Sequence, residues 1–147
     1  MYKILLVEDA PAASSSINNL LSGFCQLHIT SSANIALHLS SLNIYNLVMI
    51  DINLHPEGSA INTANTIKNM SSYNSFPIVG FTLLKIVENK EYLLSRGYTH
   101  LIVEPFNARN FAQYIKFILS SHLDTNRHEF IPVGKTPVPK MIFYNGK

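Results

Sequence analysis

The stretch Tyr45-Asn46-Leu47-Val48-Met49-Ile50-Asp51-Ile52-Asn53 decides the fold of this 147-residue chain. An uninterrupted apolar run of this length is typical of a strand that is buried on both faces of a parallel sheet. The run ends at Asp51, so this carboxylate is expected at the carboxyl end of the strand. Open α/β sheets have their ligand crevice at that edge. We therefore expect a parallel sheet with Asp51 as a functional residue.

The rest of the chain alternates between strand-like and helix-like segments. Strands are expected over 3–7, 25–29, 45–53, 76–81 and 99–103. Helices are expected over 11–23, over 58–70, over 85–96, and after caps at Ser31 or Ser32 and at Asn107. Such alternation indicates βα units with right-handed crossovers. The predicted fold class is α/β: a doubly wound three-layer sandwich around a five-stranded parallel sheet in the flavodoxin-like order 2-1-3-4-5.

The helices are expected to pack through apolar residues at helical spacing. In the helix after Ser31 or Ser32 these residues are Ile35, Ala36, Leu39 and Leu42. In the helix over 58–70 they are Ala60, Ala64 and Ile67, and in the last helix Phe111, Ile115, Ile118 and His122.

The length fits one domain, expected over residues 1–123. From Asp124 the periodic pattern breaks, and residues 124–147 contain prolines and cations without a helical period. We expect this segment to be a C-terminal extension or linker rather than a separate domain. Its Gly134-Lys135-Thr136 resembles the end of a P-loop, but Glu129 stands where the first glycine would be. A nucleotide site there is rejected.

The composition favours a folded globular protein, because 47% of the residues are apolar and only 14% are charged. A net charge of +2 is too small to indicate nucleic-acid binding. The single cysteine, Cys25, cannot form an internal disulfide and is expected to be a buried, inert thiol in a reducing compartment. No apolar run has the length of a membrane span or a signal peptide. A cytoplasmic location is therefore expected.

Polar residues follow four of the expected strands. Glu8 and Asp9 follow the first, Asp51 the third, Thr82 the fourth and Glu104 the fifth. In this topology these strand ends converge on one crevice. Three carboxylates from two adjacent strands form a hard-oxygen site that suits Mg²⁺. The alternative is that the acids merely cap helix N-termini.

Such a site has a definite chemistry. A carboxylate beside Mg²⁺ can attack a phosphoryl group and form an aspartyl phosphate, which makes Asp51 the candidate acceptor. The backbone carbonyl of Asn53 can add a metal ligand, and the hydroxyl of Thr82 can contact a phosphoryl oxygen. A metal-dependent phosphatase would use the same acids. It ranks last, because aspartate-nucleophile phosphatases have a second acid where this chain has Asn53.

Four motifs follow one another along the chain, over 5–9 (LLVED), 49–53 (MIDIN), 77–82 (PIVGFT) and 97–106 (GYTHLIVEPF). With these motifs, residues 2–122 resemble a response-regulator receiver (CheY-like) domain of two-component signalling. The resemblance implies that Asp51 is the phosphoacceptor and Thr82 the switch hydroxyl. It implies that Glu8, Asp9, Asp51 and the Asn53 carbonyl bind Mg²⁺. It also implies a sensor histidine kinase or histidine phosphotransfer protein as partner, with no enzymatic activity beyond self-phosphorylation and autodephosphorylation, and no direct nucleic-acid binding.

Three positions depart from the family pattern. Glu104 replaces the lysine that precedes the Pro-Phe pair, and Leu101 replaces the aromatic switch residue. The loop over 54–58 is shorter and differently spaced. An ionised Glu104 would leave a Mg²⁺-loaded pocket at a charge of about −2 rather than about zero, and unit charges about 4 Å apart interact by roughly 4 kcal/mol at an effective dielectric near 20.

Several alternatives stay open at this stage. Glu104 can point away, Lys85 can replace the missing cation or remain a solvated helix-end cation, or the chain can be a pseudo-receiver that signals without phosphate. His55 can contact an incoming phosphohistidine or a metal, or be a plain loop histidine. Receivers dimerise through a face made by their fourth helix, fifth strand and fifth helix. Here that face would include Tyr92, Leu93 and Leu101, unless these residues belong to the core.

Overall fold

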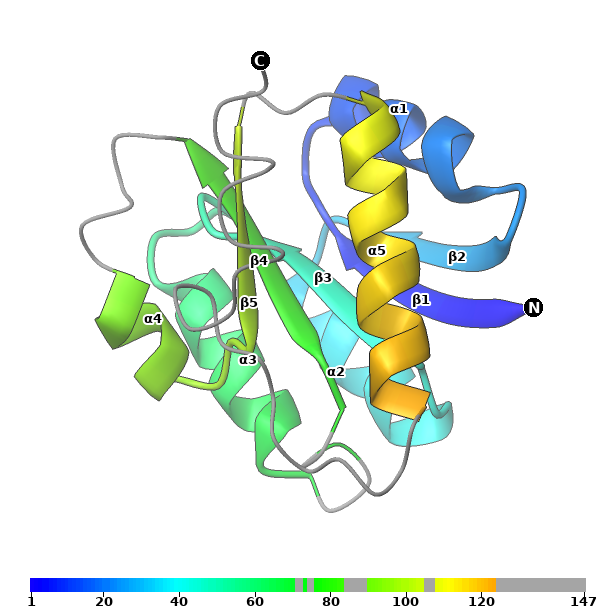
Figure 1. Cartoon of the computed structure of the whole chain (residues 1–147). Helices are drawn as coiled ribbons and strands as arrows, with labels where there is room; N and C mark the ends of the chain where they lie inside the picture. The colour runs from blue at the N-terminus through cyan, green and yellow to red at the C-terminus, as the bar shows by residue number, and fades with distance from the viewer. Residues whose placement is uncertain (71–72, 74–75, 84–89, 105–107, 124–147) are drawn as a thin grey trace.

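The computed structural model describes residues 1–70, 73, 76–83, 90–104 and 108–123. The strands are β1 (Tyr2–Val7), β2 (Cys25–Thr30), β3 (Leu47–Asp51), β4 (Ile78–Leu83) and β5 (His100–Glu104). The helices are α1 (Pro11–Leu21), α2 (Ala33–Leu42), α3 (Ser59–Lys68), α4 (Lys90–Ser95) and α5 (Ala108–Leu123). All neighbouring strands pair in parallel in the order β2-β1-β3-β4-β5 (Figure 1). The predicted fold class and strand order are confirmed.

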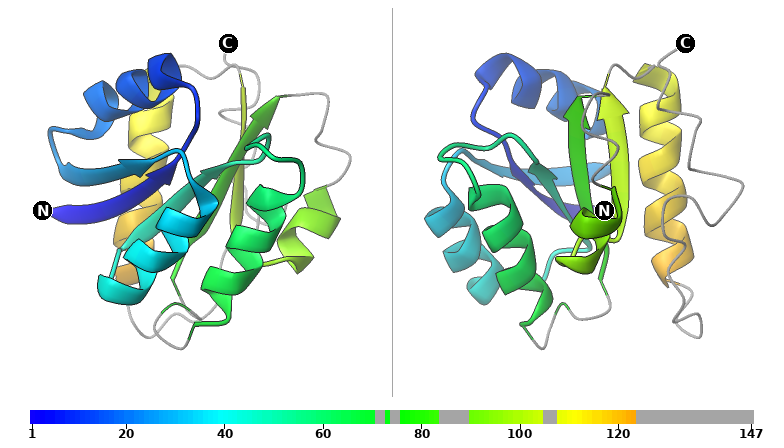
Figure 2. Two further views of the ribbon diagram at one scale, coloured as in Figure 1. Left: turned by 180° about the vertical axis from the view of Figure 1, so that it is seen from behind. Right: turned by 90° about the vertical axis from the view of Figure 1, so that its left-hand side faces the viewer.

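Helices cover both faces of the sheet (Figure 2). Alternate residues of β1 enter two separate cores, Leu5 on the side of α2, α3 and α4, and Ile4 on the side of α1 and α5. The residues of β3 divide in the same way, and Leu47 to Ile50 are all fully buried. This burial on both faces explains why the strand reads as a continuous apolar run rather than as an alternating one.

The residues just before β3 hold the strand in place. The backbone N–H of Lys3 donates to Oδ1 of Asn46, and the N–H of Asn46 donates to the carbonyl of Lys3, both at 2.8 Å. The buried Tyr45 pairs its hydroxyl with Nδ1 of His28 at 2.7 Å. These contacts tie the start of β3 to β1 and β2, so the register that brings Asp51 to the edge is fixed from the other end of the strand.

The helix caps and faces agree only in part with the sequence. Of the two predicted caps of α2, the structure uses Ser32, whose Oγ accepts from the N–H of Ile35 at 3.1 Å. The predicted apolar face of α2 is wrong at Ile35 and Leu42, which are 52% and 68% exposed. Ala36 is buried as predicted, and Leu39 is half-buried against the core. Ser40, which the prediction left out, is buried as well.

The apolar faces of two other helices are confirmed. Ala60, Ala64 and Ile67 of α3 are buried, as are Phe111, Ile115 and Ile118 of α5. Cys25 is only 3% exposed and lies in the core beneath α1 and α5, as expected for an inert thiol. The side chain of His122, the predicted cap at Asn107 and the predicted extension over 124–147 lie outside the described part of the chain. Among the described residues, none of the helices has the length and apolar character needed to cross a bilayer.

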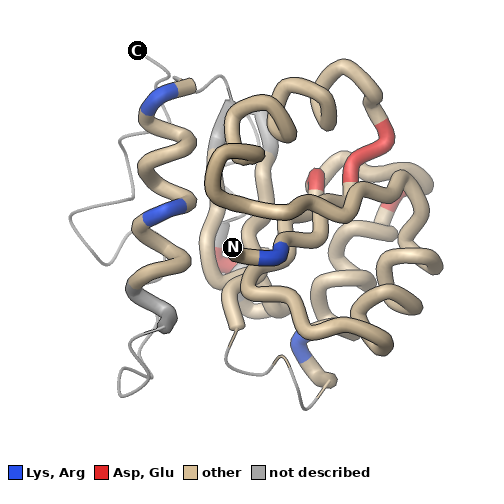
Figure 3. The backbone as a smooth tube through the Cα atoms, turned by 90° about the vertical axis from the view of Figure 1, so that its right-hand side faces the viewer, with Lys and Arg blue, Asp and Glu red and all other residues tan. Residues whose placement is uncertain are grey.

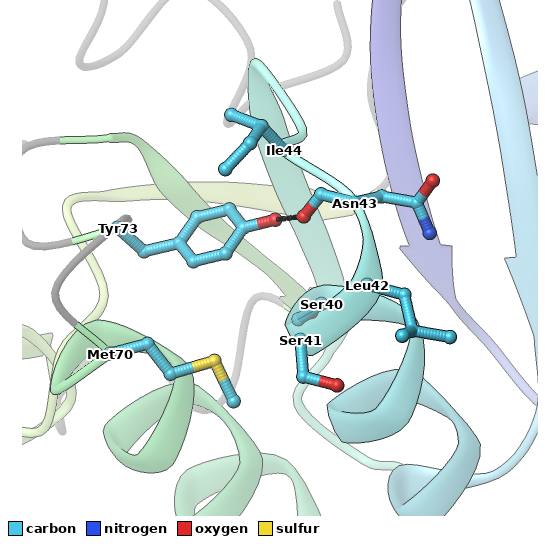
Figure 4. A pocket seen from close by; sticks show the side chains of 7 residues that line it. All are labelled: Ser40, Ser41, Leu42, Asn43, Ile44, Met70 and Tyr73. Carbon is cyan, nitrogen blue, oxygen red and sulfur yellow. Dashed lines mark hydrogen bonds between the residues drawn. The ribbon is translucent and has the colours of Figure 1, made fainter.

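A pocket of about 250 Å³ lies at the amino end of β3, the opposite end from Asp51 (Figure 4). Tyr73 spans it and donates its hydroxyl hydrogen bond to the carbonyl of Asn43, while the same oxygen accepts from the N–H of Tyr45 at 3.0 Å. The described residues that line the pocket are Ser40, Ser41, Leu42, Asn43, Ile44, Met70 and Tyr73, and none of them is charged. The acidic cluster found among the described residues, Glu8, Asp9 and Asp51, does not line this pocket.

Candidate functional site

Three carboxylates converge at the carboxyl edge of the sheet. Glu8 and Asp9 directly follow β1, and Asp51 is the last residue of β3. These strands are neighbours in which Val7 pairs with Ile50, so their ends meet. One oxygen from each of the three carboxylates lies within 4.8 Å of the others. In Figure 3, acidic positions lie near the turn from β1 to α1, whereas the Lys and Arg positions of α5 lie apart from them.

Glu8 is the most buried of these acids, with 5% of its surface exposed. Its Oε2 accepts a hydrogen bond from the N–H of Ala10 at 3.0 Å. The pKa of Glu8 is raised to about 7, chiefly by burial, with the charge and the hydrogen bond of Asp51 adding to the rise and the Ala10 hydrogen bond opposing it. Such a carboxyl group favours a nearby positive charge. The donor set, three carboxylates on one small volume, fits a hard divalent cation.

Asp9 is held by the loop that follows β3. Its Oδ2 accepts from the backbone N–H of His55 and pairs with Nδ1 of the same residue, both at 3.2 Å. Burial would raise the pKa of Asp9, but the hydrogen bonds from the side chain and backbone of His55 outweigh it, and the pKa is lowered. The structure thus shows His55 in contact with Asp9, a predicted metal ligand, which the sequence did not predict. Its contact with a phosphohistidine or a metal stays a prediction.

Asp51 is fixed by the turn that it begins. Its Oδ1 accepts from the N–H of Asn53 at 2.9 Å, and its carbonyl accepts from the N–H of Leu54 at 3.0 Å. Leu54 is buried and anchors the loop in the core. The loop ends at Gly58, whose φ of +87° favours glycine, and α3 begins at the next residue. The structure thus orients the carboxylate of Asp51, while ligation by the Asn53 carbonyl stays a prediction.

Thr82 and Glu104 lie at the same edge of the sheet by backbone register. Asp51 pairs with Phe81, so Thr82 is one residue beyond, and Leu83 pairs with Glu104, the last residue of β5. The side chains of Thr82 and Glu104, and all of Lys85, lie outside the described part of the structure. Their predicted roles as switch hydroxyl, lysine replacement and substitute cation stay predictions.

The predicted dimerisation face loses two of its three residues. Leu93 and Leu101 are each 3% exposed and belong to the core beneath α2, α3 and α4. Only Tyr92 of the three is exposed, at 55%. Leu101 at the aromatic switch position is therefore a packed core residue.

Tyr98 is a residue near the site to which the sequence gave no role. It is buried, and its hydroxyl donates to the carbonyl of Ala60 at 3.0 Å. Its ring packs on Gly80 so closely that a Cβ there would lie 2.9 Å from the ring. Burial and then the charge of Asp51 raise its pKa, so the phenol stays neutral. Tyr98 thus joins β4 to α3 next to the acidic cluster.

Comparison with known proteins gives a likeness in three dimensions. No protein-family model and no curated protein matches the sequence. Among solved structures, the chemotaxis response regulator CheY4 of Vibrio cholerae matches with a TM-score of 0.73 and 20% identity, over 80% of this chain and 98% of that chain. A CheY-like receiver domain protein from Methanospirillum hungatei matches with a TM-score of 0.74 and 22% identity, over 84% and 97%.

The fold is that of a response-regulator receiver domain. The resemblance inferred from four sequence motifs is thereby confirmed at the level of the fold. A third receiver domain, from the sensor histidine kinase PA1611 of Pseudomonas aeruginosa, matches with a TM-score of 0.71 and 19% identity, over 81% of this chain and 98% of that chain. That receiver domain is described with a magnesium ion coordinated in its active site cleft.

Proposed function

We propose that the chain is a signalling receiver domain that accepts a phosphoryl group on Asp51. The donor is the phosphohistidine of a sensor histidine kinase or a histidine phosphotransfer protein. The observation that carries this proposal is the convergence of Glu8, Asp9 and Asp51 within 4.8 Å at the carboxyl edge of a receiver fold. The protein would act in the cytoplasm as a switch rather than as an enzyme, since its own chemistry is the gain and loss of that group.

Mg²⁺ is the cation we propose for the site. Glu8, Asp9 and Asp51 would hold it, with the Asn53 carbonyl as a further ligand. When bound, the cation supplies positive charge to the acids and to the oxygens of the incoming phosphoryl group. The burial of Glu8 beside two other acids supports this assignment, because it raises the pKa of that carboxyl group to about 7, and a cation between the three carboxylates would offset their crowding.

The residues of the chain define the transfer. The N–H of Asn53 donates to Oδ1 of Asp51 and orients the carboxylate. A carboxylate oxygen of Asp51 would form the new bond to phosphorus as the bond between phosphorus and the donor imidazole nitrogen breaks. The hydroxyl of Thr82, at the end of the next strand, would contact a phosphoryl oxygen. Attack by water on phosphorus would later release inorganic phosphate and restore Asp51.

Labelling with a small phosphodonor tests the proposal. The protein is incubated with acetyl phosphate and Mg²⁺ and then weighed intact by mass spectrometry. We expect the gain of one phosphoryl group, lost in Asp51→Asn and in the presence of EDTA. Glu57→Gln is the matched control, because Glu57 is an exposed acid of the same loop outside the cluster. A wild-type protein that gains no mass in this experiment would remove the proposal.

The reversed charge at Glu104 can be tested by restoring the cation. Glu104→Lys is expected to increase the labelling of Asp51, because an ionised glutamate beside the phosphoryl group opposes its binding. Equal labelling of the two proteins would show that Glu104 does not face the site. Lys85→Ala reports on the alternative cation: a loss of labelling would assign that role to Lys85.

A second candidate function is a pseudo-receiver, an interaction module whose output does not require phosphate. It is favoured by Leu101, which stands at the aromatic switch position and is packed in the core. The Asp51→Asn variant separates the two functions in cells. An unchanged output supports the pseudo-receiver, and a lost output supports the phosphorylated switch.

Dimerisation through the face made by α4, β5 and α5 would depend on Tyr92. Analytical ultracentrifugation of Tyr92→Ala beside the wild type tests this dependence.

A further inference from the structure

We propose that His55 is a positioning residue for Asp9, through which the loop after β3 is coupled to cation binding. The inference rests on the proposed metal site and adds to it a residue from outside the acidic cluster. Its basis is geometric: His55, in the loop after β3, makes two contacts with Oδ2 of Asp9, which follows β1.

The two contacts use one side of Asp9. Both the backbone N–H and Nδ1 of His55 are 3.2 Å from Oδ2. Neither of these contacts involves Oδ1, which we therefore assign to the cation. A carboxylate held at one oxygen by two donors has lost its freedom to rotate, so its other oxygen is presented in a fixed direction. Hydrogen bonds of this kind to ligating carboxylates orient the ligand and increase metal affinity.

The loop that carries His55 is itself anchored at both ends. On one side, Leu54 is 1% exposed, and its N–H donates to the carbonyl of Asp51 at 3.0 Å. On the other side, the N–H of Ser59 donates to the carbonyl of Pro56 at 3.0 Å. His55 is thus presented by a short, hydrogen-bonded turn. Its imidazole is 85% exposed, so burial of the ring does not explain its position, and the contact with Asp9 does.

Cation binding and the conformation of the turn that carries His55 should each affect the other. If His55 holds Asp9 in the orientation that a cation requires, a bound cation must in turn stabilise the turn that carries His55. The same turn holds Oδ1 of Asp51 through the N–H of Asn53. The loop over 53–55 therefore contacts two of the three carboxylates and transmits the state of the metal site to the start of α3.

Calorimetric titration of the full chain with Mg²⁺ at neutral pH tests the role of His55. We expect His55→Ala to weaken binding by about tenfold, the lower end of the range for residues that orient ligands. His55→Asn should remain within about threefold of the wild type, because its amide nitrogen can donate where Nδ1 does. Glu57→Ala, an exposed change two residues away, should bind like the wild type. Binding by His55→Ala that equals or exceeds that of the wild type would overturn the proposal, as would failure of His55→Asn to rescue.

Two further readouts separate positioning from a general loss of structure. In an Asp9→Ala background, His55→Ala should cause no additional loss of Mg²⁺ affinity, because the carboxylate that the imidazole of His55 contacts is already absent. Amide hydrogen exchange over 53–58 should slow with Mg²⁺ in the wild type and change less in His55→Ala. An additive double variant, or equal slowing in both proteins, would contradict the coupling.

The titration needs no phosphodonor, so its outcome is independent of the transfer reaction. Mg²⁺ binding that depends on His55, in a protein whose Asp51 is not labelled, would remove the proposed phosphoryl transfer and leave the role of His55 intact. If Asp51 of the wild type is labelled normally and His55→Ala binds Mg²⁺ as tightly as the wild type, the role of His55 is removed and the proposed phosphoryl transfer remains. A wild-type protein that does not bind Mg²⁺ would remove both.

Discussion

Glu8 is a buried carboxyl group beside two other acids, and its pKa of about 7 makes stability depend on pH. With the cation removed by EDTA, folded Glu8 keeps a proton that unfolded Glu8 has lost between its ordinary value of 4.5 and about 7. Its contribution to the free energy of unfolding is therefore complete below the unfolded pKa and is lost as pH rises through the folded pKa. We expect the melting temperature in EDTA to fall from pH 5 to 8.

The Glu8→Gln variant is the control for this pH dependence. The substitution removes the titrating group, so the stability of this variant should change little between pH 5 and 8. For the wild type, the loss in the free energy of unfolding over that range is at most about 3 kcal/mol. Asp9 does not contribute there, because its lowered pKa moves its titration to more acidic conditions. A wild-type curve parallel to that of Glu8→Gln would show that Glu8 titrates normally in the folded protein.

Gly80 is required by the packing of a neighbouring ring. A Cβ at this position would lie 2.8 Å from Cδ1 of Ile52 and 2.9 Å from the ring of Tyr98. We expect Gly80→Ala to reduce the free energy of unfolding by about 1–3 kcal/mol, the usual cost of overpacking. Urea denaturation measures this loss. Gly23→Ala is the matched control, since a Cβ there would meet nothing within 4 Å, and an equal loss in both variants would refute the packing argument.

At the scale of elements, α2 provides a direct test of its cap. Ser32→Ala removes the acceptor for the N–H of Ile35 and should reduce stability by about 1 kcal/mol. Ser31→Ala, the other cap that the sequence allowed, should have little effect. Thermal or urea denaturation of the two variants distinguishes them, and equal stabilities would mean that the cap contributes nothing.

The sequence predicted the existence of the elements better than the way they pack. The run from Leu47 to Ile50 identified β3 because burial on both faces leaves no alternation. For α2, helical spacing allowed more than one apolar face. The protein buries Ala36 and Ser40 and leaves Ile35 and Leu42 exposed, and this choice depends on how the helix packs on the sheet, which is a tertiary effect.

At the scale of the whole molecule, a bound cation should stabilise the fold. Mg²⁺ at about 100 times its dissociation constant should add about 2.7 kcal/mol to the free energy of unfolding, since it binds carboxylates that only folding brings together. The melting temperature should rise by several degrees and should not respond in Asp51→Asn. An equal rise in that variant would indicate binding at another place.

The acidic cluster could be predicted because parallel topology alone brings Glu8, Asp9 and Asp51 to one edge. The contacts of His55 and Tyr98 could not, since both depend on how a loop closes over the sheet. His55 meets an acid from a distant strand end, and the ring of Tyr98 packs on a glycine of β4. Neither contact leaves a periodic signal in the sequence.

Cys25 has a practical consequence for measuring motion in this protein. It is the sole cysteine of the chain, it is buried, and burial raises its pKa to about 12, so almost no reactive thiolate exists at neutral pH. A maleimide dye or nitroxide can therefore be attached at a newly introduced exposed cysteine, such as Tyr92→Cys, without first deleting the native thiol. Spectroscopy on such conjugates would follow α4 in an otherwise unaltered molecule.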